Sequence, residues 1–136
     1  MITGIHHVSI KCGSAEDFKK TTAFYTEILG MKVLRSWGEG KDAGVMLTIS
    51  GSDILEIFAS GQESVGNGSV NHFAFYTDDP DECIEKVRNA GYEITEEPDN
   101  VDLILKQPIP GNVYPLRVAF CTGPAGESIE FFSERI

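Results

Sequence analysis

The stretch Ile5-His6-His7-Val8-Ser9-Ile10 begins a short segment in which apolar and polar residues alternate. Side chains along a β-strand point to opposite faces in turn, so His7 is expected on the face opposite Val8 and Ile10. The pattern predicts a strand over residues 4–12 that packs through one face. The other face presents the His7 imidazole.

In each of three more segments, one side chain that could bind a metal ion lies on the strand face opposite the packing residues. These are His72 opposite Phe73 and Phe75, Glu56 opposite Leu55 and Ile57, and Glu130 opposite Ile129 and Phe131. Buried carboxylates are costly without a partner, so packing alone does not explain four such positions. Two imidazoles with two carboxylates suit a divalent metal ion. The sequence therefore predicts His7, Glu56, His72 and Glu130 as the ligands of one ion.

The two halves of the chain follow the same order of elements. In the first half, the strand precedes a helix over 15–29, which Gly30 closes, and strands over 32–37, 43–49 and 53–59. After a Gly/Ser/Asn-rich connector, 61–69, the second half has a strand over 70–77 and a helix that begins after Asp79 and ends at Gly91. We expect an α+β fold in which two tandem βαβββ modules, 1–66 and 67–136, form one domain with a curved mixed sheet around a metal cleft.

One stretch, 98–115, is longer than the tight hairpin that the repeat requires. Long ordered insertions often carry binding function. The alternative is a surface excursion or an oligomer contact, and the sequence does not separate the two.

Composition narrows the class of protein. The chain has 136 residues, 41% of them hydrophobic, and a net charge of -10 at pH 7. Such a charge repels phosphate backbones and anionic membrane surfaces, which argues against nucleic acid and membrane partners. No apolar run approaches the ~20 residues of a membrane span, and a cytoplasmic location is expected. Cys12, Cys83 and Cys121 lack the spacing of a disulfide framework or a zinc–thiolate site.

Several motifs together give the chain a family resemblance. They are Ile5-His6-His7-Val8-Ser9-Ile10, Phe24-Tyr25-Thr26-Glu27-Ile28-Leu29-Gly30, Leu55-Glu56-Ile57-Phe58, Asn71-His72-Phe73-Ala74-Phe75 and Gly126-Glu127-Ser128-Ile129-Glu130-Phe131. With them the chain resembles the vicinal oxygen chelate superfamily, which includes glyoxalase I, methylmalonyl-CoA epimerase, extradiol dioxygenases and antibiotic resistance proteins. The His-Glu-His-Glu set is most similar to that of glyoxalase I, a lactoylglutathione lyase. A fourth ligand at Glu56 would leave two open octahedral positions, one fewer than the dioxygenases use.

The resemblance implies a mechanism and partners. One divalent ion (Ni, Co, Zn, Mn or Fe) would polarise the carbonyl of a small α-hydroxycarbonyl or thiol-conjugate substrate and stabilise an enediolate. Glu130 or Glu56 would be the catalytic base, and the resemblance favours Glu130. A homodimer is expected, with the metal site either within one chain or shared between two.

A few other residues are candidates for substrate binding or for structural roles. Lys11 shares the phase of His7 and is a candidate for an anionic substrate group, whereas Ser60 replaces the Asn with which the related enzymes contact glutathione. His6 should face away from His7. Arg117 suits either a carboxylate clamp or a surface salt bridge.

Two other functions stay open at this point. The same cleft would suit a small-molecule binding or resistance protein without turnover. It would also suit an acyl-CoA epimerase, which needs the same metal and a second base on the opposite face of the substrate.

Overall fold

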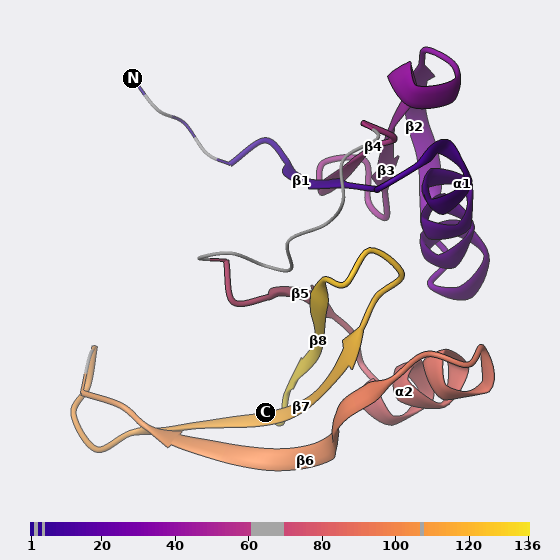
Figure 1. Ribbon diagram of the computed structural model, residues 1–136. Coiled ribbons are helices and arrows are strands. Elements are labelled where there is room, and N and C mark those ends of the chain that lie inside the picture. The colour runs from indigo at the N-terminus through magenta and orange to yellow at the C-terminus, as the bar shows by residue number, and fades with distance from the viewer. Residues whose placement is uncertain (2, 4, 61–69, 107) are drawn as a thin grey trace. The chain divides into compact units, whose positions relative to one another are not determined.

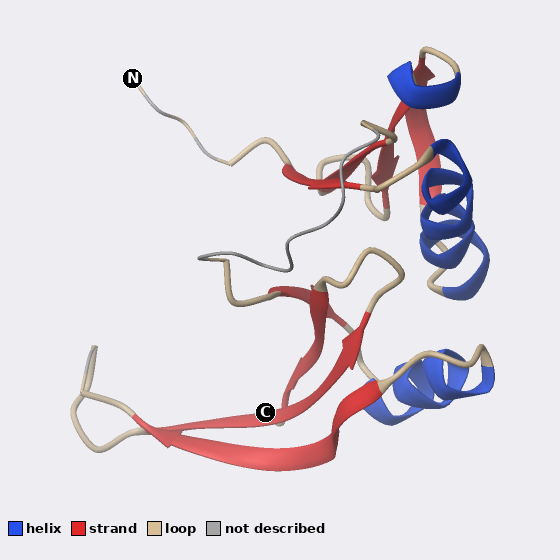
Figure 2. Cartoon of the chain, viewed as in Figure 1, coloured by secondary structure: helices blue, strands red, loops and turns tan. Residues whose placement is uncertain are grey.

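The computed structural model describes residues 1, 3, 5–60, 70–106 and 108–136. The chain forms two compact units, with residues 1–66 and 124–127 in unit 1 and residues 67–123 and 128–136 in unit 2. The described residues give each unit a four-stranded mixed sheet with an α-helix beside it (Figures 1 and 2). The predicted α+β class with curved mixed sheets is confirmed. The connector expected at 61–69 lies outside the described residues.

Unit 1 contains the first βαβββ series. Its elements are β1 (Val8–Lys11), α1 (Ala15–Ala23), a π-helical turn η1 (Phe24–Ile28), β2 (Lys32–Trp37), a 3₁₀ turn η2 (Gly40–Asp42), β3 (Gly44–Thr48) and β4 (Ile54–Phe58). The strand order is β1-β4-β3-β2. β1 runs parallel to β4, and the other pairs are antiparallel. Strand β2 is thus an edge strand, and β4 lies between β1 and β3.

The helix predicted over 15–29 ends earlier as an α-helix. Ser14 caps α1 by accepting a hydrogen bond from the Asp17 N–H at 3.0 Å. From Phe24 the backbone widens to a π-turn, in which the Leu29 N–H donates to the Phe24 carbonyl at 3.2 Å. Both Phe24 and Tyr25 are then fully buried. The two rings meet edge-on, with their centroids 5.0 Å apart.

Unit 2 repeats the topology. Its elements are β5 (Phe73–Tyr76), α2 (Pro80–Asn89), β6 (Ile94–Ile104), β7 (Val113–Thr122) and β8 (Ser128–Glu134), in the sheet order β5-β8-β7-β6. β5 runs parallel to β8, as β1 does to β4. Asp79 caps α2 and Pro80 occupies its first position, as predicted. The predicted domain boundaries, one domain over 1–136 with modules 1–66 and 67–136, stay a prediction.

The stretch 98–115 is mostly strand. Strands β6 and β7 continue their pairing to Ile104 and Val113, whereas β8 pairs with β7 only as far as Leu116. The turn is closed by the Leu105 N–H, which donates to the Asn112 carbonyl at 2.7 Å. The extra length therefore forms a two-stranded ribbon that projects from the sheet of unit 2 (Figure 1).

The loop 124–127 connects β7 to β8 but belongs to unit 1. Its Glu127 is buried and accepts hydrogen bonds from the Tyr25 hydroxyl at 2.6 Å and the Ala125 N–H at 2.9 Å. Burial raises the pKa of Glu127, against the opposing effect of the Tyr25 hydrogen bond. This loop supplies unit 1 with a buried carboxyl that comes from late in the sequence.

No helix in the described ranges has the length and apolar character needed to cross a membrane. Cys12, Cys83 and Cys121 are not joined in disulfides; Cys12 and Cys121 are buried and Cys83 is half-buried.

Asp53 organises the turn between β3 and β4, and its removal should destabilise unit 1. Its Oδ1 accepts hydrogen bonds from the Thr48 hydroxyl (2.8 Å), the Ile49 N–H (2.9 Å) and the Ser50 N–H (2.8 Å). Burial opposes ionisation, but these bonds together lower the pKa of Asp53 from 3.8 to about 2. We expect Asp53→Ala to cost about 1–2 kcal/mol at pH 7, since the site is solvent-exposed.

Urea unfolding across pH tests this role. A lowered folded-state pKa means that the Asp53 contribution is present above pH 3.8 and is lost as the pH falls toward about 2. The difference between wild type and Asp53→Ala should therefore shrink between these pH values. Asp53→Asn, which keeps an acceptor oxygen, is the matched control. A difference that does not change with pH would contradict the role of the ionised carboxylate.

Candidate metal centre

The first candidate pair lies in unit 1. His7 precedes β1, and the parallel register pairs Ser9 with Glu56, so His7 and Glu56 point to the same face of the sheet. The His7 Nε2 lies 3.3 Å from the Glu56 Oε1. His6 is packed edge-on against the His7 ring at 5.2 Å, with the two Nδ1 atoms 2.9 Å apart. Of the two adjacent histidines, His7 is the one that the structure sets against the carboxylate.

The second pair lies in unit 2 and has the same construction. Strand β5 pairs Ala74 with Glu130, and the His72 Nε2 lies 2.9 Å from the Glu130 Oε2. The Asn71 Oδ1 lies 2.5 Å from the His72 Nδ1. Since an amide oxygen only accepts, Nδ1 donates this bond, which leaves Nε2 to face Glu130. Phe120 supports the imidazole edge-on at 5.2 Å.

The two pairs have the spacing of adjacent metal ligands. With metal–ligand bonds of about 2.1 Å, neighbouring donor atoms lie about 3.0 Å apart in an octahedron and about 3.4 Å apart in a tetrahedron. The observed separations are 3.3 Å for His7–Glu56 and 2.9 Å for His72–Glu130. Each carboxylate side chain is only 9–11% exposed, and each imidazole is 33–35% exposed. Neutral imidazole and carboxylate donors in this arrangement fit a divalent ion.

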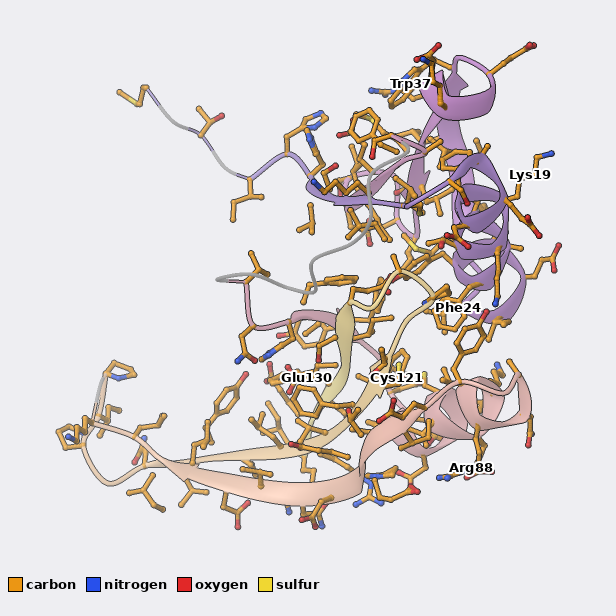
Figure 3. The ribbon with its side chains drawn as sticks, viewed as in Figure 1. Lys19, Phe24, Trp37, Arg88, Cys121 and Glu130 are labelled. Carbon is orange, nitrogen blue, oxygen red and sulfur yellow. The ribbon has the colours of Figure 1, made fainter. Side chains whose placement is uncertain are left out.

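The surroundings of Glu130 perturb the ionisation of its carboxyl group. Burial raises the pKa of Glu130, the neighbouring His72 lowers it, and the charge of Glu96 raises it. The net direction is upward. Figure 3 shows the Glu130 side chain on β8, the strand between β5 and β7 in the sheet of unit 2.

The donors are grouped in twos within each unit. Over the described ranges, no group of three or more His, Cys, Asp or Glu side chains is assembled to hold a metal ion. The structure therefore brings His7 to Glu56 and His72 to Glu130. That all four hold one ion stays a prediction.

The remaining sequence candidates lie as follows. Lys11 pairs with Phe58 across β1 and β4, on the face of Glu56. The Ser60 hydroxyl donates to the Cys12 backbone carbonyl at 3.5 Å. Arg117 binds the Asp81 carboxylate through two nitrogens, at 2.6 and 2.7 Å. Of the two roles considered for Arg117, the salt bridge is the one observed.

The sequence did not indicate that Arg35 and Trp37 of β2 lie on the face of the candidate site. Strict alternation would place Arg35 and Trp37 on the face of Val33. The register shifts between Val33 and Arg35, so that Arg35 pairs with Met46 and Trp37 with Gly44. Met46 pairs in turn with Glu56, which puts Arg35 and Trp37 on the candidate-site face. A bulge of one residue carries no clear sequence signal.

A second missed group lies on unit 2. The hydroxyls of Tyr76 and Tyr114 both donate to the Glu134 Oε1 at 2.9 Å. This hydrogen bond is the main reason that the pKa of Tyr114 rises to about 12. Glu134 follows Glu130 at an interval of four residues, on the same face of β8. The alternation along β8 indicated the face on which Glu134 lies, but it did not indicate that Tyr76 and Tyr114 bind it.

A family model describes nearly the whole chain. Residues 4–131 match the Glyoxalase/Bleomycin resistance protein/Dioxygenase superfamily. The chain belongs to this superfamily. The predicted family is thereby confirmed.

Within the superfamily, one curated relative is lactoylglutathione lyase GLX1 of Arabidopsis thaliana, 32% identical over 103 residues. The match covers 70% of this chain and 35% of that protein, so the chain spans about a third of its length. The trypanothione-dependent glyoxalase I of Leishmania major is 26% identical with a TM-score of 0.67, over 97% of this chain and 87% of that one.

A third relative shares the fold. FosX of Listeria monocytogenes, a fosfomycin resistance protein solved with Mn(II) and 1S,2S-dihydroxypropylphosphonic acid, is 22% identical with a TM-score of 0.67. The match covers 96% of this chain and 90% of that one. A glyoxalase I and a fosfomycin resistance protein thus both share the fold of this chain.

Proposed function

We propose that this chain is a metal-dependent lyase or isomerase of the glyoxalase I type. Its substrate would be a small α-hydroxycarbonyl compound or a thiol conjugate, such as a hemithioacetal. The observation that carries the proposal is the pair of matched His–Glu contacts, at 3.3 and 2.9 Å, on equivalent strands of the two units. The similarity to the Arabidopsis and Leishmania enzymes supports the reaction type.

The proposed ligands are His7, Glu56, His72 and Glu130, which together hold one divalent ion (Ni, Co, Zn, Mn or Fe). Such an ion would polarise a substrate carbonyl and make the adjacent C–H acidic. Among these metals, N/O ligation alone does not select one, so availability decides. Asn71 has a supporting role, because it fixes the tautomer and ring orientation of His72.

Glu130 is the proposed base. Its carboxylate would take the proton from the substrate carbon next to the carbonyl and return it to the neighbouring carbon. The buried environment of Glu130 limits the water that would otherwise exchange this proton. Glu56, with the same position in unit 1, is the alternative base. Lys11, on the face of Glu56, is proposed to bind an anionic substrate group.

Metal analysis followed by substrate assays tests the function. We expect about one divalent ion per complete ligand set after loading, because the donors converge only in the folded protein. A panel of hemithioacetals and acyl-CoA thioesters should then show turnover of a hemithioacetal. Turnover limited to exchange at the carbon α to a thioester would indicate an epimerase. Bound ligand without any turnover, or the absence of stoichiometric metal, would contradict the proposal.

A further inference from the structure

Strand β2 presents Arg35 and Trp37 on the face of Glu56. Trp37, the single tryptophan of the chain, pairs with Gly44 on β3, which pairs with Phe58 on β4. In the adjoining row, Arg35 pairs with Met46, and Met46 with Glu56. Two residues along a strand span about 7 Å, so the Trp37 row lies next to the Glu56 row.

Gly44 allows the indole to lie on the sheet. A Cβ at this position would come within 2.4–2.5 Å of three atoms of the Trp37 ring system. The indole thus occupies the space above Gly44, and its ring meets that of Phe58 at 5.9 Å with an interplanar angle of 65°. Trp37 remains 37% exposed. Its ring is fixed from below and from one side, with surface left for another flat group. Figure 3 marks its position at the end of β2.

Arg35 adds a positive charge to the adjoining row, that of Met46 and Glu56. The other three arginines of the chain are held in ion pairs, Arg88 with Glu85 and Glu97, Arg117 with Asp81, and Arg135 with Asp102. Arg35 makes no ion pair with a carboxylate of the described residues; its recorded contact is the Met46 sulfur, 3.7 Å from Nη1. In a chain with a net charge of -10, an arginine held in this way beside a candidate site suits an anionic group of a ligand.

We propose that Trp37 and Arg35 select the substrate, and that it carries an aromatic ring with an anionic substituent. The inference rests on the proposed function, in that the oxygens of the reacting end would lie at the metal ligands. The ring would stack on Trp37, and Arg35 would pair with the anionic substituent. Gly44 is then a positioning residue, because its missing side chain sets the place of the indole.

Three probes separate these contributions. Lactate has two adjacent oxygens and a methyl group, mandelate replaces the methyl with a phenyl ring, and 4-carboxymandelate adds an anion to that ring. Binding is followed by calorimetry and by the fluorescence of Trp37, in metal-free and in zinc-loaded protein. We expect mandelate to bind about tenfold more tightly than lactate. The added carboxylate should contribute about threefold more, as an exposed ion pair does.

Variants of unit 1 assign the effects. Trp37→Leu should abolish the preference for mandelate over lactate, and Arg35→Gln the preference for 4-carboxymandelate over mandelate. Gly44→Ala, whose backbone conformation any residue can adopt, should displace the indole and also abolish the mandelate preference. Val33→Ala, on the same strand but the opposite face, is the control and should leave all three affinities unchanged.

Three results would overturn the proposal. The first is equal affinity of the wild type for lactate and mandelate, and the second is no saturable binding of any probe. The third is a preference for mandelate over lactate that survives in both Trp37→Leu and Gly44→Ala. Urea unfolding of these variants would then show that Trp37 only covers Gly44. Absence of bound metal would defeat the proposed function separately, since the ring preference is also measured in metal-free protein.

Discussion

Glu130→Gln should lower turnover by about 10²–10⁴-fold while changing metal occupancy far less. Gln has the shape of Glu and still offers a carbonyl oxygen to a metal ion, but its amide does not accept a proton near neutral pH. Glu130 lies 2.9 Å from the His72 Nε2 on a central strand, and because Gln matches its shape we expect the packing to be kept. Steady-state kinetics under saturating metal, with elemental analysis of the same sample, would measure both quantities.

Two companion variants sharpen this result. Glu97→Gln removes an exposed carboxylate that binds Arg88 and should leave turnover unchanged. Glu56→Gln tests whether the base lies in unit 1 instead. If Glu130→Gln keeps a near-normal rate, Glu130 is not the base.

His72→Ala should remove metal binding. Loss of a residue that hydrogen-bonds to a metal ligand typically lowers metal affinity ~10–100-fold. Loss of the ligand itself should lower the affinity further. The unpaired Glu130 carboxylate would then remain largely buried without the His72 Nε2 beside it. Elemental analysis and competition with a chromogenic chelator would give the affinity. Stoichiometric metal in His72→Ala would refute the proposed ligand set.

Mixing two variants decides whether chains share a site. A dimer made from one His7→Ala chain and one His72→Ala chain has an intact ligand set only if the unit 1 ligands of one chain meet the unit 2 ligands of the other. Random reassortment of a 1:1 mixture puts about half of the chains in such mixed dimers, each with one intact site of two, so recovery of about a quarter of the wild-type metal would indicate sharing. Sedimentation equilibrium with and without metal would show whether assembly and binding are coupled.

Much of the fold followed from local patterns. The capping residues Ser14 and Asp79 predicted where the two α-helices begin, and Gly30 and Gly91, both with positive φ, where the helical segments end. Alternation in β4 and β8 placed Glu56 and Glu130 opposite buried apolar residues. These features depend on neighbours close in sequence, which is why the sequence alone predicts them.

Features set by distant pairing were not predictable. The sequence indicated that the stretch 98–115 is longer than a tight hairpin, but nothing local reveals that β6 and β7 continue to pair beyond the end of β8. The one-residue bulge in β2 reverses the faces of Arg35 and Trp37, and depends on the register with β3. At the candidate metal centre, the sequence indicated the ligand types and the strand faces on which they lie. It did not indicate the hydrogen bond that the His72 Nδ1 donates to Asn71, because that bond depends on how the side chains are placed.

The loop 124–127 limits how this chain can be divided. A tandem repeat suggests two halves that recombination could exchange as separate pieces, with a cut near residue 66. Unit 1, however, includes Glu127, which accepts the hydroxyl of the fully buried Tyr25. A first half inherited without this loop would lose that carboxyl from its interior. A cut near residue 66 would therefore separate Tyr25 from its Glu127 acceptor, so unit 1 depends on a segment that lies late in the sequence.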